Sequence, residues 1–399
     1  MFHKVSEGIL SFYIRIFNSI GFFVYVPLLS LWLVKLKGLD ITEASVVIAI
    51  FTFISKAGSA VVGGIINKLG VKKSLLIGLW GSAVLLSILV IIDYYIIILF
   101  MVLMLGILIS IYNVSLKTHI SLLEEDKRLH AFALLNIAVN IGASIGPFLG
   151  GLALDWNPLG ILIIAIICYL LAGALTLLLP NIKVEELEQN LNILQFIKNR
   201  KYNRHFLIFL KFTVFSGVFW FLYSQIFTTF PVVVSKDFSG KTIGLFFTIN
   251  ALTVILFQGI YPKIQPKFKI ENWYFFSLVL IGISYFLIWI SRNFLIISIS
   301  IIIFSIAEII WVPTIDSQVV AKKGDLSSSW AFGFSGVFWG IWESIGGLIG
   351  LNIYKYFGQQ TFLCFTIICG VILVVYIFGM TNSSVTFFVK KQGVKREEL

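Results

Sequence analysis

The chain has 399 residues, of which 59% are hydrophobic and only 12% are charged. Soluble domains are roughly 45–50% apolar and about 25% charged, so this composition excludes an ordinary soluble globular protein. The formal net charge of +11 does not indicate nucleic-acid binding, because lysine and arginine collect in the cytoplasmic loops of membrane proteins and orient the chain.

Apolar runs between charged or Gly- and Pro-containing turns predict twelve membrane-spanning helices, each needing about 20 apolar residues. The first six are expected at 9–34, 42–66, 74–92, 96–117, 131–153 and 159–179. The second six are expected at 205–232, 242–262, 273–291, 294–319, 328–353 and 361–381. The predicted fold class is an all-α integral membrane protein built from two six-helix halves.

The chain therefore divides into four predicted parts. They are an N-terminal six-helix half over 1–180, a central cytoplasmic linker over 181–203, a C-terminal six-helix half over 204–381 and a cytoplasmic tail over 382–399.

The distribution of positive charge predicts the orientation in the membrane. If the N-terminus is cytoplasmic, the cytoplasmic segments hold 20 of the 30 Lys and Arg residues and the outer loops hold six. This bias predicts a multi-pass protein of the plasma membrane with both termini in the cytoplasm. The expected partners are the lipid bilayer and a small-molecule substrate, without nucleic acid, and we expect a monomer.

The loop after the second span places cations at a helix end and a glycine where the chain must turn sharply. Its sequence is Gly63-Gly-Ile-Ile-Asn67-Lys68-Leu-Gly70-Val-Lys72-Lys73. The string resembles the loop between helices two and three of the major facilitator superfamily, G-x-x-x-D-R-x-G-R-[RK]-[RK]. Asn67 stands where the family usually has aspartate, which weakens any charge-relay latch here and leaves hydrogen bonding. The candidate conformational residues of this loop are Gly63, Asn67, Lys68, Gly70, Lys72 and Lys73.

The fourth span departs from a pattern common in drug exporters of this superfamily, an arginine four residues before a glycine. Val102 stands four residues before Gly106, so the basic residue that is often tied to proton coupling is missing. Basic residues stand instead at Arg15 in the first span and Lys56 in the second.

The fifth span contains the string Gly142-Ala-Ser-Ile-Gly146-Pro147-Phe-Leu-Gly150-Gly151. Glycines at i, i+4 and i+8 let another helix approach closely, and a proline inside the helix bends it. The glycines alone also fit ordinary helix packing. The whole string resembles the fifth-helix signature of the same superfamily, found mainly in its antiporters and exporters. We expect Gly146 and Pro147 to lie where the two halves meet.

An internal repeat supports the division into halves. A shift of 200 residues lays Gly146 on Gly346 and Gly150 on Gly350, and each segment follows a short charged loop and opens a helix. Parallel halves related by an axis along the membrane normal are one of the known transporter plans.

Charged residues inside the spans are functional candidates, because charge within a bilayer is costly. The first half holds Arg15 and Lys56, and the second holds Glu308, Glu343 and Asp316. A structural ion pair or snorkelling to the interface is the alternative, but Glu308 and Glu343 are expected near the midplane, beyond snorkelling reach. The three carboxylates are the candidate proton-coupling residues. The candidate substrate-binding residues are Arg15, Tyr25, Lys56, Asn113, Trp220, Tyr223 and Trp311.

Two other patterns carry no function of their own. Gly240-Lys241-Thr242 mimics the end of a phosphate-binding loop, but Ser235 stands where the first glycine is required, so ATP hydrolysis is not expected. His119 and His130 flank an acidic loop without the spacing of a metal site. We expect no metal and no cofactor, with the proton gradient as the driving force, and no enzymatic activity.

The resemblance implies a drug- or metabolite:proton antiporter that works by alternating access. Cations on one wall of a central site and carboxylates on the other suit a small polar or zwitterionic cargo, for which we expect an opine-type metallophore or a siderophore. Multidrug efflux is the main alternative, followed by a proton-coupled nutrient symporter and a non-transporting membrane receptor.

Overall fold

The computed structural model describes residues 7–58, 62–123, 125–180, 204–323 and 328–381. These residues form helices joined by short turns, with no β-strand among them, so the predicted all-α class is confirmed. The linker 181–203 and the tail 382–399 lie outside the described residues, and so do the side chains of 124–130 and of Asn67.

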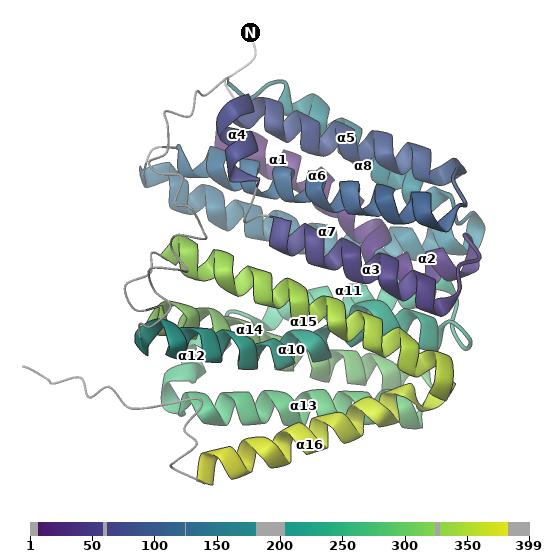
Figure 1. Ribbon diagram of the computed structural model, residues 1–399, viewed down its shortest axis with the longest axis vertical. Helices are drawn as coiled ribbons and strands as arrows, with labels where there is room; N and C mark the ends of the chain where they lie inside the picture. The colour runs from purple at the N-terminus through teal and green to yellow at the C-terminus, as the bar shows by residue number, and fades with distance from the viewer. Residues whose placement is uncertain (1–6, 59–61, 124, 181–203, 324–327, 382–399) are drawn as a thin grey trace, which may run out of the picture.

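The first group of helices covers the N-terminal half of the chain (Figure 1). It comprises α1 (Glu7–Tyr25), η1 (Val26–Leu28), α2 (Leu29–Lys35), α3 (Ile41–Ala57), α4 (Gly63–Leu69), α5 (Val71–Ile91), α6 (Tyr95–Ser121), α7 (Glu125–Trp156) and α8 (Gly160–Thr176). Pro27 lies in the 3-10 turn between α1 and α2, where its missing amide hydrogen interrupts the α-helical bonding.

The second group stacks against the first along the long axis of the molecule (Figure 1). It comprises α10 (Arg204–Val234), α11 (Gly240–Phe257), α12 (Tyr261–Ile264), η3 (Gln265–Lys267), α13 (Ile270–Ile290), α14 (Phe294–Lys322), α15 (Ser328–Phe357), η4 (Gly358–Gln360) and α16 (Thr361–Thr381).

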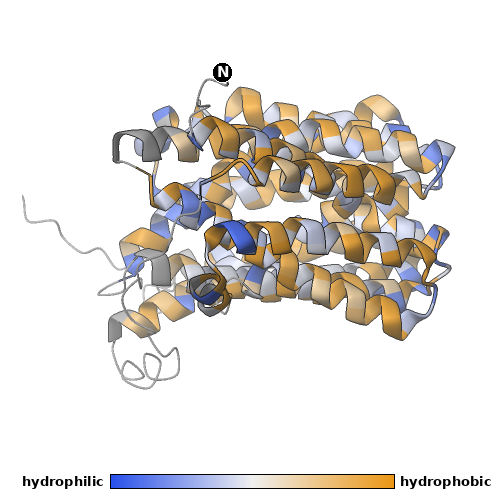
Figure 2. Ribbon diagram, turned by 90° about the horizontal axis from the view of Figure 1, so that it is seen from above, coloured by the Kyte–Doolittle hydropathy of each residue, from blue (hydrophilic) through white to orange (hydrophobic). Residues whose placement is uncertain are grey.

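The predicted spans each correspond to helix in the described part of the chain. Nine segments there are long and apolar enough to cross a membrane, and one of them, Ala331–Phe378, covers most of both α15 and α16. Helices α3 and α8, of 17 residues each, complete the set. Hydrophilic residues gather toward the helix ends (Figure 2). The predicted second span over 42–66 falls on α3 and α4, which lie on either side of residues 59–61, outside the described residues.

The glycine stripe of α7 packs α7 against α1 within the first group. A Cβ on Gly146 would lie 2.8 Å from the Cβ of Phe23 and 2.9 Å from the backbone nitrogen of Val24. Gly142 and Gly150 face the same helix. The expectation that Gly146 lies between the halves is therefore wrong: its lack of a side chain serves packing inside one half.

The 200-residue repeat is visible in this packing. Gly346 and Gly350 of α15 face α10, as Gly146 and Gly150 of α7 face α1. The Gln225 Nε2 donates a hydrogen bond to the Gly346 carbonyl at 2.9 Å and holds the second pair together.

Two equivalent pairs of helices join the groups: α7 packs against α11, and α15 packs against α3. Gly244 of α11 lies against the Pro147 carbonyl, and Gly240 lies against Gly151. The expectation for Pro147 is therefore confirmed, and Gly151 joins it at the contact between the groups.

The loop that follows α4 also takes its expected form. Gly70 has a φ of 80°, a left-handed conformation that favours glycine, and it separates α4 from α5. The Lys72 ammonium donates to the carbonyls of Leu177 and Leu179, both at 2.7 Å, and so satisfies free carbonyls after the end of α8.

Candidate functional site

The first wall of the candidate site is cationic. Arg15 on α1 donates hydrogen bonds from Nη1 to the side-chain oxygens of Asn113, at 2.7 Å, and Asn18, at 3.3 Å. Its guanidinium also lies 5.8 Å from the centre of the Tyr112 ring. These neutral groups orient Arg15 without neutralising it, so the charge stays available to an anion.

Two lysines, Lys56 on α3 and Lys117 on α6, add to this wall. Lys117, one turn beyond Asn113 on α6, lies near enough to interact electrostatically with both Arg15 and Lys56. We call Arg15, Lys56 and Lys117 the cationic cluster. Like charges gathered in this way repel one another, and an anion bound between them relieves that repulsion.

The second wall carries two carboxylates. Glu308 on α14 accepts a hydrogen bond from Asn250 on α11, with 3.1 Å between Oε2 and Nδ2, and Asn250 also donates to the Ser305 hydroxyl at 2.8 Å. Tyr223 on α10 interacts electrostatically with both Glu308 and Glu343. Glu308 is thus surrounded by neutral polar groups.

Four rings pack together on the same wall, Trp220, Tyr223, Trp311 and Trp339, which we call the aromatic cluster. The ring of Trp220 stacks on that of Trp339 at 3.8 Å between centroids and meets Trp311 edge-on at 4.6 Å. Tyr223 lies 5.7 Å from Trp220 and 5.8 Å from Trp311. The faces of such rings attract cations.

One contact connects the two walls. The Lys56 ammonium, on α3 of the first group, lies 3.9 Å from the centre of the Trp339 ring on α15 of the second. Glu343, one turn beyond Trp339, interacts electrostatically with Lys56. A lysine of one half thus packs on an aromatic ring of the other half and is attracted by a carboxylate there.

Other predicted site residues lie apart from this arrangement. Tyr25 is 1% exposed and its hydroxyl lies 3.4 Å from that of Tyr169, so it belongs to the interior of the first group. Asp316 is an exposed residue eight positions beyond Glu308 on α14. Trp311, by contrast, belongs to the aromatic cluster and is fully buried there.

The candidate residue set omitted Asn250 and Trp339. A lone amide in the apolar run of α11 marks Asn250, and a spacing of four residues on a helix marks Trp339 as a neighbour of Glu343. Either signal is weak without the partner helix, because most polar residues and tryptophans in spans serve packing.

The two groups are joined at one end of the bundle, which carries residues 36–40 and 235–239 and which we call the distal end. The Lys355 ammonium at the end of α15 donates to the carboxylate of Asp40, the N-cap of α3, at 2.7 Å. It also donates to the Thr42 hydroxyl at 2.9 Å. We call these contacts the first latch.

The second latch lies at the equivalent place in the repeat, since Asp155 and Gly240 lie 200 residues from Lys355 and Asp40. The Asp155 carboxylate accepts the backbone amides of Gly240, at 2.6 Å, and Lys241, at 2.7 Å. An anion here is stabilised by the positive end of the α11 dipole. The string that resembles a phosphate loop is thus a helix start that binds a carboxylate of the other half.

We expect Asp40→Asn to open the distal end slightly. The hydrogen bond from Lys355 lowers the pKa of Asp40 to about 2. The first latch should therefore be at full strength above the ordinary aspartate pKa near ~3.9 and be lost as the pH falls through about 2, with no change between roughly pH 5 and 8. The effect should be small because the pair is exposed.

The measurement is maleimide labelling of a cysteine placed at Ser45, a buried residue beside the first latch. Asp93→Asn is the matched control, because Asp93 pairs with Lys37 inside one group. Equal labelling of the Asp40 and Asp93 variants would show that the first latch does not hold the halves together.

Comparison with known proteins agrees with this architecture. A family model described as Major Facilitator Superfamily matches residues 12–346. An uncharacterized MFS-type transporter of Bacillus subtilis (strain 168), YqjV, is 24% identical over 323 residues, which are 77% of each chain.

Solved structures share the fold at low sequence identity. The nucleoside transporter NupG superposes with a TM-score of 0.78 at 14% identity, covering 95% of this chain and 100% of its own. A POT family transporter in complex with 5-aminolevulinic acid gives a TM-score of 0.75 at 15% identity, covering 93% of this chain and 95% of its own.

Proposed function

The chain belongs to the major facilitator superfamily and is a multi-pass membrane transporter, and we propose that it is a proton-coupled exporter of a small zwitterionic metabolite. The observation that carries the proposal is the opposition of charges across the two halves. Arg15, Lys56 and Lys117 stand on one wall, and Glu308 and Glu343 stand on the other.

A molecule with both carboxylate and ammonium groups satisfies both walls at once. Its carboxylate would meet the cationic cluster, with Arg15 held in place by Asn113. Its ammonium would meet Glu343 and the aromatic cluster, whose ring faces attract cations. Such a molecule binds fully only when the halves are close, which couples binding to alternating access.

Glu308 is the proposed proton site. Its neighbours Asn250 and Tyr223 are neutral, and a lone charge in this position is costly within a bilayer. Uptake of a proton from one side of the membrane neutralises Glu308 and removes that cost. Release of the proton to the other side restores the charge and the cost. Cargo and proton would then favour different conformations of the same site, so that they do not bind together, as antiport requires.

The direction of transport and the orientation rest on sequence patterns. The signature of the fifth span favours export, and the excess of Lys and Arg favours a cytoplasmic position for both termini in the plasma membrane. With that orientation the latched distal end faces outward and the site faces the cytoplasm. A monomer suffices, because both walls come from one chain. An opine-type metallophore or siderophore, which carries several carboxylates and amines, is the proposed cargo.

The test is transport in reconstituted vesicles with an imposed pH gradient. 5-Aminolevulinic acid, the ligand of the similar POT family structure, is a suitable first probe because it carries one amine and one carboxylate. Uptake that is driven by the gradient in the antiport direction, and that zwitterions inhibit more strongly than monovalent cations, supports the proposal. Symport in the opposite direction would contradict export.

We expect Arg15→Gln to weaken binding of a carboxylate-bearing cargo about tenfold to 100-fold, since hydrogen bonds to charged groups contribute roughly 1.5–3 kcal/mol. Binding of a cationic dye should change little. Competition binding in detergent measures both ligands on the same protein. An equal loss for both would indicate that Arg15 serves structure, through Asn113 and Asn18, rather than recognition.

Multidrug efflux is the second candidate, and the aromatic cluster favours it because stacked rings beside carboxylates suit lipophilic cations. In that case the Arg15 variant should bind cations more tightly than the original protein, because one repelling charge is gone.

A further inference from the structure

Around Trp339, the second half of the protein carries the two kinds of group that bind organic cations, an aromatic ring and a carboxylate. One face of the Trp339 ring stacks on Trp220, with 3.8 Å between centroids and 19° between planes. Glu343 follows Trp339 by one helical turn of α15 and supplies a carboxylate. An aromatic ring beside a carboxylate is a common way for proteins to recognise an ammonium group.

The occupant of this site is a lysine from the other half. The Lys56 ammonium lies 3.9 Å from the centre of the Trp339 ring, much closer than the roughly 6 Å that defines a cation–π contact. Glu343 attracts the same charge. Gly340 allows the approach, because the backbone of α15 can pass close to the Cβ of Lys56 only where it bears no side chain.

Glu343 and Trp339 also interact with each other. Oε2 of Glu343 and Nε1 of Trp339 are both buried, and the indole of Trp339 acts as a hydrogen-bond donor toward the Glu343 carboxylate. The aromatic ring and the negative charge are therefore held together as one site for a cation.

Lys56 also stands where the chain can release it. It is the residue before the last one of α3, which ends at Ala57. Its long side chain is attached to the first half, whereas its partners belong to the second, so any separation of α3 from α15 withdraws it from the site.

We propose that Trp339, Trp220 and Glu343 form the ammonium subsite of the cargo, and that Lys56 is the tethered occupant of this subsite in the cargo-free protein. The ligand class is a primary or quaternary ammonium group. Cargo displaces Lys56, which then joins Arg15 on the carboxylate side. The assignment of this subsite to cargo rests on the proposed function, but its affinity for ammonium does not.

The test removes the Lys56 ammonium from the subsite by mutation. A tethered competitor that fills the subsite about 90% of the time reduces the affinity of a free ligand about tenfold. Lys56→Gln should therefore bind tetramethylammonium about tenfold more tightly than the original protein. Quenching of tryptophan fluorescence in detergent and calorimetry provide two readouts, and neither requires transport.

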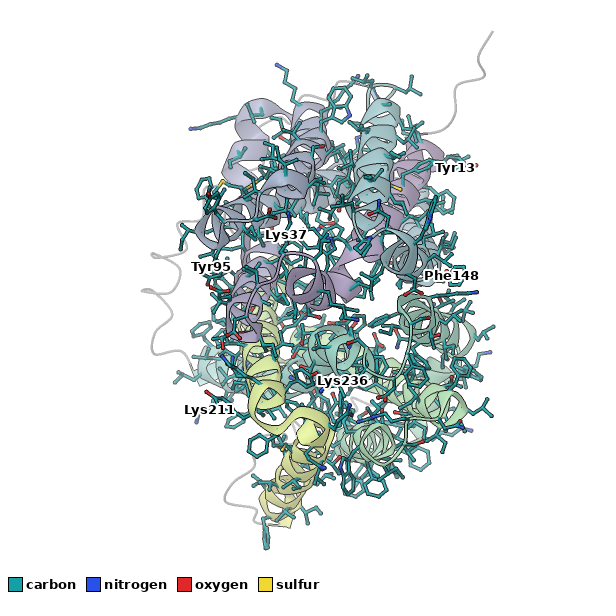
Figure 3. The ribbon with its side chains drawn as sticks, turned by 90° about the vertical axis from the view of Figure 1, so that its right-hand side faces the viewer. Tyr13, Lys37, Tyr95, Phe148, Lys211 and Lys236 are labelled. Atoms are coloured by element: carbon teal, nitrogen blue, oxygen red, sulfur yellow. The ribbon has the colours of Figure 1, made fainter. Side chains whose placement is uncertain are left out.

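Two further variants make the test specific. Adding Glu343→Gln to the Lys56 variant should remove the gain. Lys236→Gln is the matched control: Lys236 lies at the distal end, in view in Figure 3, with its ammonium 5.7 Å from the Tyr354 ring, and its loss should not change the affinity.

A folded Lys56→Gln protein that binds tetramethylammonium no better than the original would overturn the proposal, and so would a gain that survives Glu343→Gln. Monodisperse elution and an unchanged helical circular dichroism spectrum establish folding. If the gain appears but no pH-driven transport is found, the subsite stands and the proposed function fails. If transport is found without the gain, Lys56 is a structural contact and the exporter proposal remains.

Discussion

Replacing Glu308 by glutamine should abolish transport against a concentration gradient while leaving exchange down a gradient nearly intact. Glutamine has the shape of the protonated carboxyl group and can keep a hydrogen bond with Asn250, so the site should still bind cargo and change conformation. It cannot release a proton. A pH difference of one unit corresponds to about 1.36 kcal/mol per proton, so about tenfold accumulation should fall to none.

The measurement uses vesicles in which the pH gradient and the cargo gradient are set independently. Asp316→Asn is the matched control, because Asp316 is on the same helix but exposed and eight residues away. It should retain accumulation. If Glu308→Gln still accumulates cargo, Glu308 does not couple transport to protons, and Glu343 takes its place in the mechanism; loss of accumulation in Asp316→Asn would instead assign the coupling to Asp316.

Glu308 and Glu343 differ in a way that the sequence does not reveal. Both are single carboxylates near the middle of apolar helices. In the structure Glu343 faces a lysine of the other half, whereas Glu308 faces the amide of Asn250 and the ring of Tyr223. A carboxylate that has a cation nearby is suited to remain charged, and one among neutral groups is suited to change its protonation. We therefore propose Glu343 as the cargo ligand and Glu308 as the coupling residue.

The sequence was a good predictor of helices, because the bilayer requires about 20 apolar residues wherever the chain crosses it. The backbone conformation at Gly70 was also predictable. Gly70 has the positive φ expected of a glycine at a sharp turn, and such a turn depends only on the residues beside it.

Which face of each helix packs against which neighbouring helix was much less predictable than the positions of the helices in the sequence. The glycine spacing of α7 indicates close packing but does not say against which helix, and Gly146 faces α1 while Pro147 faces α11 only one residue later. The contact of Lys56 with Trp339 joins residues 283 positions apart, on helices of different halves. Such pairs depend on the tertiary arrangement, which the repeat suggests only in outline.

Helix α7 makes one glycine contact with α1 and another with α11. Adding a methyl group at these two contacts should have different consequences. In Gly146→Ala the new Cβ would press on Phe23 and Val24 of α1, inside one half. If each half moves as a rigid unit, this contact persists through the transport cycle, so the change should destabilise the fold. Overpacking of this kind costs about 1–3 kcal/mol, and a lower melting temperature with a smaller yield of folded protein should reveal it.

In Gly244→Ala the new Cβ would meet the Pro147 carbonyl and approach the Phe148 Cα at 3.0 Å, across the two halves. Separation of the halves at the distal end relieves this clash, so only the closed conformation is penalised. A penalty of about 1–3 kcal/mol shifts the equilibrium toward distal opening by roughly fivefold to 150-fold. Maleimide should then label a cysteine at Ser45 faster in this variant, in a background without Cys168, Cys364 and Cys369.

Gly370→Ala is the control for both variants, because a Cβ at that position of α16 would meet no other atom within 4 Å. Its melting temperature and its labelling rate should stay close to those of the original protein. If Gly244→Ala lowers stability as Gly146→Ala does and leaves labelling at Ser45 unchanged, then the contact of α7 with α11 persists through the transport cycle. The halves would in that case have to move about the remaining contacts between the groups, those of α3 with α15 and of α10 with α2 and η1.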